Sequence, residues 1–268
     1  MGPNGLPVFR SRLKILVKAC LNSPRMKSEH EAVPVLSSEI ASDVRLVVDA
    51  GAGAVHFHPR ARDGRETLDA RSCSEAVSRA RELCPGVPIG LSTAKWIESN
   101  QAKRFDAISR WEVLPDFASV NFNERGYSAL CSLLLKRGIG VEAGIWSNED
   151  AARLVKSGLH GRCLRILVEV TEKEPGRAVS LADDIEGYLK RSGVKTPRLH
   201  HGYGRAAWPV LENGILTGKD VRVGMEDTLI LADGTRAGSN KQLVEGAVLL
   251  ARRFGREPQS LPKGNTDA

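Results

Sequence analysis

Short apolar segments alternate along the chain with longer segments whose apolar residues recur every three or four positions. A short apolar run is typical of a buried strand, and the wider spacing is typical of a helix with one buried face. Eight strands are predicted, at 13–21, 54–60, 88–93, 117–122, 140–146, 162–170, 198–204 and 220–227. The predicted helices cover 37–49, 69–84, 101–111, 127–137, 147–158, 176–192, 206–213 and 239–254.

This regular alternation predicts a parallel sheet with helices outside it. Eight such units within residues 13–255 predict a single (β/α)8 barrel of the TIM type, which commonly needs about 250 residues. Residues 1–12 are expected to form a loose lead-in and 256–268 a flexible tail. An open, doubly wound sheet is the alternative, but the turn Leu21-Asn22-Ser23-Pro24 lacks the glycines that such a sheet usually carries after its first strand. Ser37 or Ser38 is expected to cap the first helix.

Composition narrows the class of protein. With 41% hydrophobic and 26% charged residues, the chain is expected to be a soluble globular protein. No apolar run approaches the ~20 residues of a membrane span, and residues 1–10 lack the apolar centre of a signal peptide, so a cytoplasmic location is expected. Five widely spaced cysteines without a CxxC pair argue against a disulfide framework or a zinc–thiolate cluster.

The net charge of +7 favours an anionic partner. Charge alone does not separate nucleic acid from a small molecule that carries phosphate. The basic residues are scattered and no nucleic-acid-binding motif appears, so nucleic acid is not expected as a partner.

Two histidines stand one residue apart near the end of the second predicted strand. His56 and His58 point to the same face of an extended chain, opposite Val55 and Phe57. Barrel active sites lie at the carboxyl ends of the strands. The pair is therefore half of a metal site on this interpretation, although buried histidines of purely structural role are common.

The eighth predicted strand supplies the candidate third ligand. If Val221, Val223 and Met225 meet the helices, Arg222 and Glu226 point into the barrel. The second and eighth strands both flank the first, so two histidines and Glu226 can form a catalytic Zn²⁺ site with an open position. The alternative is an Arg222–Glu226 ion pair that stiffens the barrel, and because Arg222 lies four residues back, the two need not touch.

Other polar residues lie at the predicted strand ends. Asp227 has the opposite parity to Glu226 and is either a base at the rim or the cap of the next turn. One of the two histidines of the seventh strand is expected to face inward and the other to meet the helices. The remaining candidates are Ser92, Thr93, Ser119, Asn121 and Glu142, together with His200, His201 and Tyr203.

Four motifs, taken together and in order, carry a resemblance to a known family. They are Val55-His56-Phe57-His58-Pro59-Arg60 with Asp63-Gly64, Leu91-Ser92-Thr93, Pro115-Asp116-Phe117-Ala118-Ser119-Val120-Asn121-Phe122, and Arg222-Val223-Gly224-Met225-Glu226-Asp227-Thr228-Leu229. The sequence resembles the β-keto acid cleavage enzymes, formerly a domain family of unknown function, over roughly Leu13 to Ala251.

The resemblance implies a (β/α)8 barrel that binds Zn²⁺, or another divalent ion, through His56, His58 and Glu226. It implies the reaction of a β-keto acid with acetyl-CoA to give acetoacetate and a new acyl-CoA by Claisen and retro-Claisen steps. Asp227 would remove the α-proton with support from Arg222. Ser92 would hold the substrate carboxylate. From their positions at the strand ends, Thr93, Ser119 and Asn121 are also predicted to bind substrate, as is Arg25 in the loop after the first strand. The resemblance also implies a homo-oligomer, often a tetramer.

Two departures from the family and two alternatives accompany this prediction. Arg25 is the plausible equivalent of a glutamate that holds a substrate amine in one member, which would disfavour a cationic substrate. Tyr203 stands where related sequences tend to have an acidic residue. The alternatives are a divalent-metal aldolase or hydrolase that does not use CoA, and a barrel that keeps a metal without catalysis.

Overall fold

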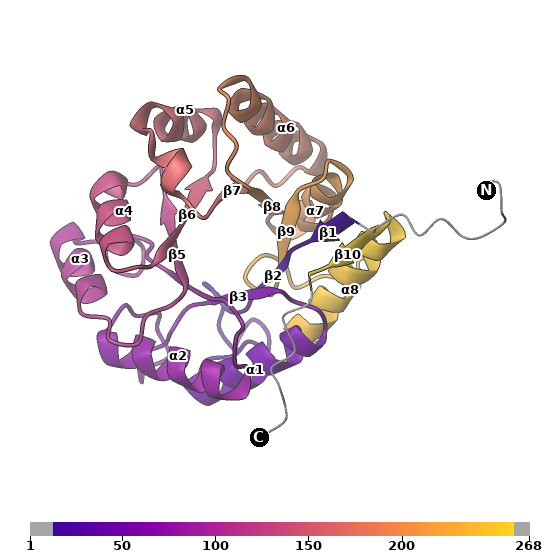
Figure 1. The fold of residues 1–268 in the computed structure, drawn as a ribbon. Coiled ribbons are helices and arrows are strands. Elements are labelled where there is room, and N and C mark those ends of the chain that lie inside the picture. The colour runs from indigo at the N-terminus through magenta and orange to yellow at the C-terminus, as the bar shows by residue number, and fades with distance from the viewer. Residues whose placement is uncertain (1–12, 260–268) are drawn as a thin grey trace, which may run out of the picture.

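Eight parallel strands close into a barrel, as the alternation of strand and helix signals predicts (Figure 1). The computed structural model describes residues 13–259. The barrel order follows the chain and is closed by the pairing of β2 with β9. The barrel strands are β2 Val17–Cys20, β3 Ala54–Phe57, β4 Ile89–Ser92, β5 Phe117–Asn121, β6 Gly140–Ile145, β7 Arg165–Val170, β8 Arg198–Gly202 and β9 Asp220–Val223.

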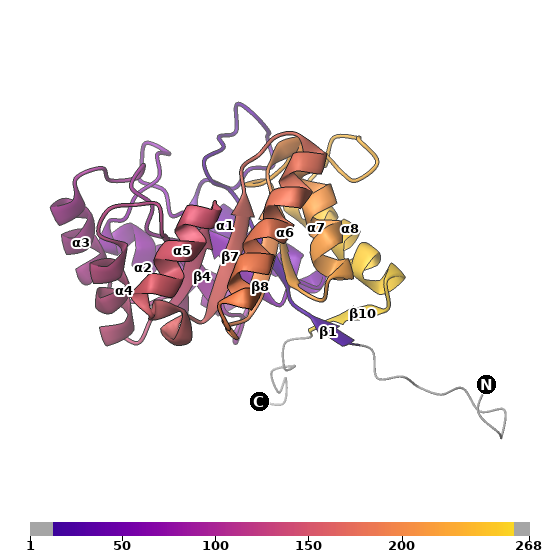
Figure 2. The same cartoon turned by 90° about the horizontal axis from the view of Figure 1, so that it is seen from above.

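Helices surround the barrel and bury their apolar faces against it (Figure 1). The long helices are α1 Ser37–Asp49, α2 Ala70–Leu83, α3 Gln101–Ser109, α4 Tyr127–Lys136, α5 Asn148–Ser157, α6 Pro175–Arg191, α7 Ala207–Leu216 and α8 Asn240–Arg253. Two 3-10 turns, η1 Leu159–Arg162 and η2 Gly204–Ala206, precede β7 and α7. Figure 2 shows the longer loops at one end of the barrel and a small two-stranded sheet at the other.

The lower part of the barrel interior is filled by side chains. Phe117 belongs to an inner apolar cluster whose other members are Leu16, Ala54, Leu167 and Leu199. Its ring occupies the space beside Gly90, where a Cβ would lie 1.9 Å from the Phe117 Cε2 atom. Glycine at position 90 therefore makes room for the aromatic ring, and the barrel is a packed core rather than a channel.

The ends of the chain depart from the prediction. The first predicted strand is divided into β1 Leu13–Ile15 and β2, because β1 leaves the barrel to pair in parallel with β10 Arg256–Pro258. The expected flexible tail thus begins with a strand. Its Arg256 guanidinium donates to the carbonyl oxygens of Lys14 and Lys219 at 2.9 and 2.6 Å. The predicted lead-in, 1–12, and the tail beyond 259 lie outside the described residues.

Several element boundaries also differ from the prediction, and the strand predicted at 54–60 ends at Phe57. The predicted strand at 162–170 begins only at Arg165, because Leu159–Arg162 form a 3-10 turn. The predicted strand at 198–204 ends at Gly202, and the one at 220–227 ends at Val223. Neither Ser37 nor Ser38 caps α1, because both lie inside the helix, which begins after Leu36; the Glu39 carboxylate accepts the amides of Val35 and Leu36.

Two expectations from composition can be compared with the described residues. None of the helices between 13 and 259 is long and apolar enough to cross a membrane. All five cysteines are free thiols, as predicted, and four of them are buried.

Candidate metal centre

His56 and His58 lie at the carboxyl end of β3, where a side chain from a neighbouring loop holds the backbone of His58. His56 is the third residue of β3, and His58 follows the strand's last residue. The Asn22 side chain bridges to the backbone of His58, accepting its amide at 2.9 Å and donating to its carbonyl at 3.0 Å. Both imidazoles are almost completely buried, and their Nε2 atoms lie 3.2 Å apart.

Glu226 reaches the histidines through a turn and not through the strand. β9 ends at Val223, and the amides of Asp227 and Thr228 both donate to the Gly224 carbonyl. A Cβ on Gly224 would lie 1.8 Å from the Cys20 carbonyl oxygen. Glycine therefore lets the turn pass close to β2. The alternation of side chains along a strand predicts Glu226 inside the barrel, but this reason is wrong because the strand ends three residues before Glu226.

The three side chains form a ligand set of the expected composition. The Glu226 carboxylate oxygens lie 4.0 Å from the His56 Nε2 atom and 3.9 Å from that of His58. Donor atoms around a four-coordinate zinc ion lie about 3.3 Å apart. The His pair has this separation, and Glu226 lies slightly farther out. Its Oε2 atom has no hydrogen-bond partner among the described residues, so the set fits a divalent cation.

The local electrostatics favour the protonation states that a metal needs. Burial and the neighbouring His58 lower the pKa of His56 well below its usual range, which keeps the imidazole neutral. Glu66 lies with Oε1 2.5 Å from the His58 Nδ1 atom and also accepts the Ser23 hydroxyl at 2.6 Å. Although burial raises the pKa of Glu66, contact with His58 and Ser23 lowers it to about 2. Such a carboxylate orients a ligating histidine.

Asp227 is buried beside the three candidate ligands. Arg222 donates to Asp227 through Nη2 at 2.7 Å and through Nε at 3.1 and 3.2 Å, and to Glu226 at 2.5 Å. The expected Arg222–Glu226 pair is therefore direct, and the same guanidinium also holds Asp227. Burial raises the pKa of Asp227, but Arg222 and His201 outweigh it and hold this pKa at about 2. The Asp227 carboxylate is therefore bound by Arg222 at the mouth of the barrel and stays ionised.

The two histidines of β8 divide as predicted. His201 faces the barrel, with Nδ1 3.4 Å from Asp227 and Nε2 3.5 Å from Glu169. His200 faces the helices, where its Nε2 lies 3.1 Å from the Glu186 carboxylate on α6. Tyr203 donates its hydroxyl to Glu169 at 2.9 Å. Tyr203 is thus tied to a carboxylate at the mouth of the barrel.

The predicted substrate residues of β4 and β5 lie at the same end of the barrel. Ser92 pairs with Ser119 across the two strands. The Ser92 Oγ accepts the Ala94 amide at 3.3 Å, and Thr93 donates its hydroxyl to the Ser119 carbonyl at 2.6 Å. Asn121 donates its amide to Glu124 at 2.9 Å, which turns the Asn121 oxygen toward Gly144. None of these hydrogen bonds reaches the candidate metal ligands.

Arg25 lies against the turn that carries Glu226. Its Nε donates to the Met225 carbonyl at 2.5 Å, and its Nη1 pairs with Glu29 at 3.0 Å. These contacts place the Arg25 guanidinium next to the turn that carries Glu226, with a quarter or less of the side chain exposed.

Two carboxylates at the site were not identified from the sequence. Glu169 pairs with His201 across β7 and β8, and its pKa is held at about 2 by His201 and Arg222 against the effect of burial. The sequence could have identified Glu169, because side chains alternate along a strand and Arg165, Leu167 and Glu169 therefore share one face of β7. Glu66 gave no such signal, since it lies in an irregular loop whose path the sequence does not determine.

The fold and this site define a (β/α)8 barrel whose mouth combines two histidines and a glutamate with a buried Arg–Asp pair, an arrangement suited to metal-assisted chemistry. The sequence profile of the beta-keto acid cleavage enzymes matches residues 14–263. The chain belongs to this family.

Relatives of established name agree with the family. A 3-keto-5-aminohexanoate cleavage enzyme of Fusobacterium nucleatum subsp. nucleatum is 27% identical over 261 residues, covering 91% of this chain and 93% of the relative. An enzyme of the same name from Acetoanaerobium sticklandii is 26% identical over 265 residues, with the same coverage.

Solved structures share the fold. ObcA, in a ternary complex with a C4-CoA adduct and oxalate, superposes with a TM-score of 0.71 at 15% identity, covering 86% of this chain and 66% of ObcA. The 3-dehydroquinate dehydratase of Aquifex aeolicus has a TM-score of 0.56 at 13% identity, covering 90% of this chain and 99% of that enzyme. At these identities the likeness concerns the barrel alone.

Proposed function

We propose that this chain is a metal-dependent β-keto acid cleavage enzyme that converts a β-keto acid and acetyl-CoA into acetoacetate and a new acyl-CoA. The observation that carries the proposal is the meeting of His56, His58 and Glu226 beside the buried, ionised Asp227. Membership of the family supports the carbon–carbon cleavage itself. Acetyl-CoA as the second substrate, and hence an acyl-transferring enzyme, is the finer part of the proposal.

His56, His58 and Glu226 would hold the ion, for which Zn²⁺ is our first choice among divalent metals. When bound, a divalent cation polarises a carbonyl oxygen and stabilises negative charge that develops there. The protein contributes a neutral His56 imidazole and a Glu226 carboxylate. It also contributes the Glu66 carboxylate that orients His58.

Asp227 is the proposed base. It takes the proton from the carbon between the two carbonyl groups of the keto acid, and the carbanion then attacks the thioester carbon of acetyl-CoA. The thiolate of CoA leaves that carbon and adds to the ketone carbon of the same adduct. The bond between the ketone carbon and the α-carbon breaks, which releases acyl-CoA and leaves its electron pair on the α-carbon. Asp227 returns its proton to this carbon, which gives acetoacetate and restores the carboxylate.

Arg222 and His201 position the Asp227 carboxylate for its proposed role as a base. Both contact its Oδ1 atom, so they hold the carboxylate in one orientation and stabilise its charge. We further propose that Ser92 holds the substrate carboxylate and that Thr93, Ser119 and Asn121 line the substrate. Arg25 disfavours a cationic substrate, and a kinetic preference for an amino-substituted keto acid would contradict this last point. We also propose that the protein assembles as a homo-oligomer, as its resemblance to the family implies.

One experiment separates metal binding from chemistry. Purified protein, Glu226→Gln and Asp227→Asn are analysed for bound metal and assayed with acetyl-CoA and a mixed panel of β-keto acids for acetoacetate. We expect Glu226→Gln to lose both metal and activity. Asp227→Asn should keep its metal and lose about 10²–10⁴ in rate, the usual contribution of a positioned base. The exposed Glu212→Gln and Asp184→Asn are matched controls that should change neither quantity.

The other outcomes point to other functions. Stoichiometric metal with keto acid consumption that does not depend on acetyl-CoA would identify an aldolase or hydrolase. Retained metal without turnover of any keto acid would identify a non-catalytic barrel. Absence of metal from the unaltered protein would overturn the assignment of His56, His58 and Glu226.

A further inference from the structure

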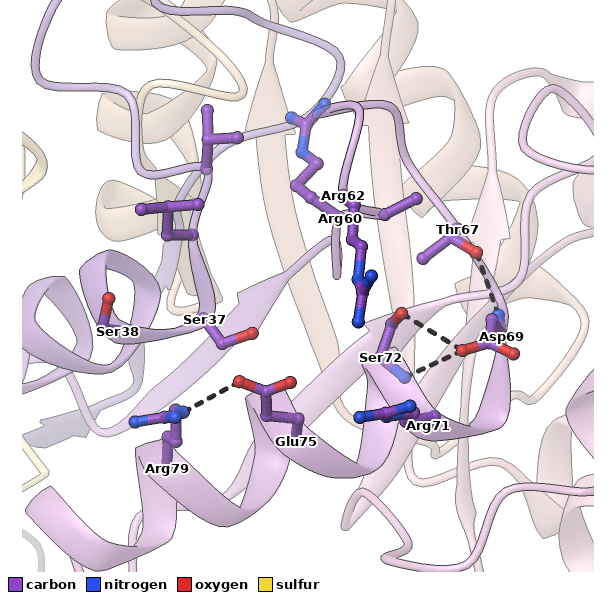
Figure 3. Close-up of a pocket in the computed structure, with 13 residues that line it drawn as sticks. Ser37, Ser38, Arg60, Arg62, Thr67, Asp69, Arg71, Ser72, Glu75 and Arg79 are labelled. Carbon is purple, nitrogen blue, oxygen red and sulfur yellow. Dashed lines mark hydrogen bonds and ion pairs between the residues drawn. The ribbon is translucent and has the colours of Figure 1, made fainter.

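A cavity of about 720 Å³ lies between the beginnings of α1 and α2, outside the metal centre (Figure 3). Arg71 and Arg79 of α2 line it from one side, and Arg60 and Arg62 line it from the loop that follows β3. Ser37 and Ser38 at the start of α1 complete the wall, and the first amides of α1 have no acceptor within the helix. The lining therefore gathers guanidinium groups, hydroxyl groups and a helix N-terminus around one space.

The arginines that line this cavity outnumber its carboxylates, which are Asp69 and Glu75. Asp69 is engaged as the cap of α2, accepting the Ser72 amide at 3.0 Å and its hydroxyl at 3.1 Å. Glu75 pairs with Arg79 at 3.0 Å. Among residues 13–259, neither Arg62 nor Arg71 has a carboxylate partner.

Arg71 occupies an electrostatically unfavourable position in its own helix. It is the second residue of α2, near the positive end of the helix dipole, where a cation is unfavourable. A bound anion would relieve this repulsion, and it would also accept hydrogen bonds from a helix N-terminus and from forked guanidinium groups.

Arg60 joins this cavity to the metal centre. Only 9% of the residue is exposed, and its Nη2 donates to the carbonyls of Asn22 and Arg25 at 2.6 and 3.0 Å. Asn22 is the residue that holds the His58 backbone. The Arg60 Nε atom has no hydrogen-bond partner within the described chain.

A second cavity, of about 570 Å³, adjoins the first on the side of the metal centre. The two share Arg60, Ala61 and Thr67, and the second is also lined by Glu66 and Trp96. Glu66 contacts His58 at 2.5 Å, and the Trp96 ring lies parallel to the His58 ring with 6.5 Å between centroids. The second cavity thus reaches two residues that lie against the candidate ligand His58, and it shares a wall with the arginine-lined cavity.

We propose that the arginine-lined cavity binds the phosphate groups at the adenosine end of acetyl-CoA, while the thioester end passes Trp96 toward the metal centre. This inference rests on the proposed function, because it takes the thioester as the second substrate. Phosphate esters match the chemistry of the lining, since arginine binds phosphate oxygens through two parallel hydrogen bonds. Arg62 and Arg71 are the residues that set affinity for this end of the molecule.

The test uses the whole protein with both arginines replaced. Calorimetry measures the binding of CoA and of adenosine 3′,5′-bisphosphate to the unaltered protein, to Arg62→Ala/Arg71→Ala and to the control Arg191→Ala. Arg191 is an exposed cation at the end of α6, across the barrel from the cavity (Figure 1). We expect the double variant to bind both ligands about tenfold to hundredfold more weakly, as the loss of two charge-assisted contacts implies. The control should bind as the unaltered protein does.

Steady-state kinetics give a second readout. The double variant should raise KM for acetyl-CoA by a similar factor, leave KM for the keto acid in place, and lose its preference for acetyl-CoA over acetyl-pantetheine, which has no adenosine phosphates. Equal weakening by Arg191→Ala would overturn the proposal, as would an unchanged affinity for CoA in the double variant. Unaltered circular dichroism shows that the double variant is folded. Calorimetry needs no turnover, so an inactive protein that still binds CoA through these arginines would contradict the proposed function and support this site.

Discussion

Buried charges occur in two layers of the barrel, and the two layers are balanced differently. In the interior, below the mouth, Glu142 lies between two cations: Lys18 at 2.6 Å and Arg165 at 3.3 Å. Lys18 and Glu142 are completely buried, and both cations lie over the Phe117 ring. This layer has enough positive charge for its single carboxylate.

The mouth has the opposite balance. One guanidinium, Arg222, serves Glu226 and Asp227 directly, and Glu169 and Glu66 lie in the same layer of side chains. Burial keeps His56 neutral. Although burial and the Arg222 charge lower the pKa of His201, Asp227 and Glu169 raise it overall, so His201 offsets only part of the carboxylate charge. Burying an ionised carboxylate is costly unless a cation accompanies it. The interior is therefore electrostatically complete, while the mouth retains carboxylate charge that a divalent ion would neutralise.

The largest expected effect is on stability and concerns the interior layer. Glu142→Gln leaves the buried Lys18 and the partly buried Arg165 without a carboxylate, and removing one partner from a buried ion pair typically costs about 3–5 kcal/mol. Chemical denaturation should show this loss while the bound metal content is unchanged. Adding Lys18→Met should restore a large part of the stability, because one uncompensated cation is removed. A single variant as stable as the unaltered protein would show that this layer is not balanced by Glu142.

The next effect concerns the mouth, through the carboxylate that contacts His58. Glu66→Gln should weaken metal binding about 10–100-fold, the usual effect of losing a partner that orients a ligating histidine. Competition with a chelator measures the affinity, and the exposed Glu212→Gln provides the matched control. If both variants bind metal as tightly as the unaltered protein, Glu66 only packs against His58.

The smallest effect tests a buried carboxylate that has an amide partner instead of a cation. Burial raises the pKa of Asp43 from 3.8 to about 7, although Asn240 donates to it at 2.7 Å. The unfolded chain is already ionised above about pH 5, so between pH 6 and pH 8 only the folded state releases this proton. Stability should therefore fall by about 1.4 kcal/mol over this range as pH rises.

Asp43→Asn removes this dependence and keeps an oxygen that can accept from Asn240. Denaturation at pH 6 and pH 8 should show that the variant loses less stability than the unaltered protein as pH rises. An identical pH dependence in both proteins would mean that Asp43 does not titrate in this range.

The architecture was determined by the sequence pattern to a large extent. Strand and helix periodicities repeat eight times, and a closed parallel barrel is the arrangement that buries the apolar face of each element. The inward orientation of His56 followed from the period of a strand, and so did the division between His200 and His201. These features are local in origin, because a strand alternates its side chains whatever surrounds it.

Contacts between distant segments were decided only by the tertiary structure. Glu226 reaches the histidines because Gly224 allows a turn to pass against Cys20, which no periodicity describes. Glu66 meets His58, and Arg256 secures β10 beside β1, through irregular backbone whose course depends on packing. The sequence by itself thus determined which residues could carry the chemistry, whereas their separations, their charge balance and the cavity beside them depend on how the loops close over the barrel.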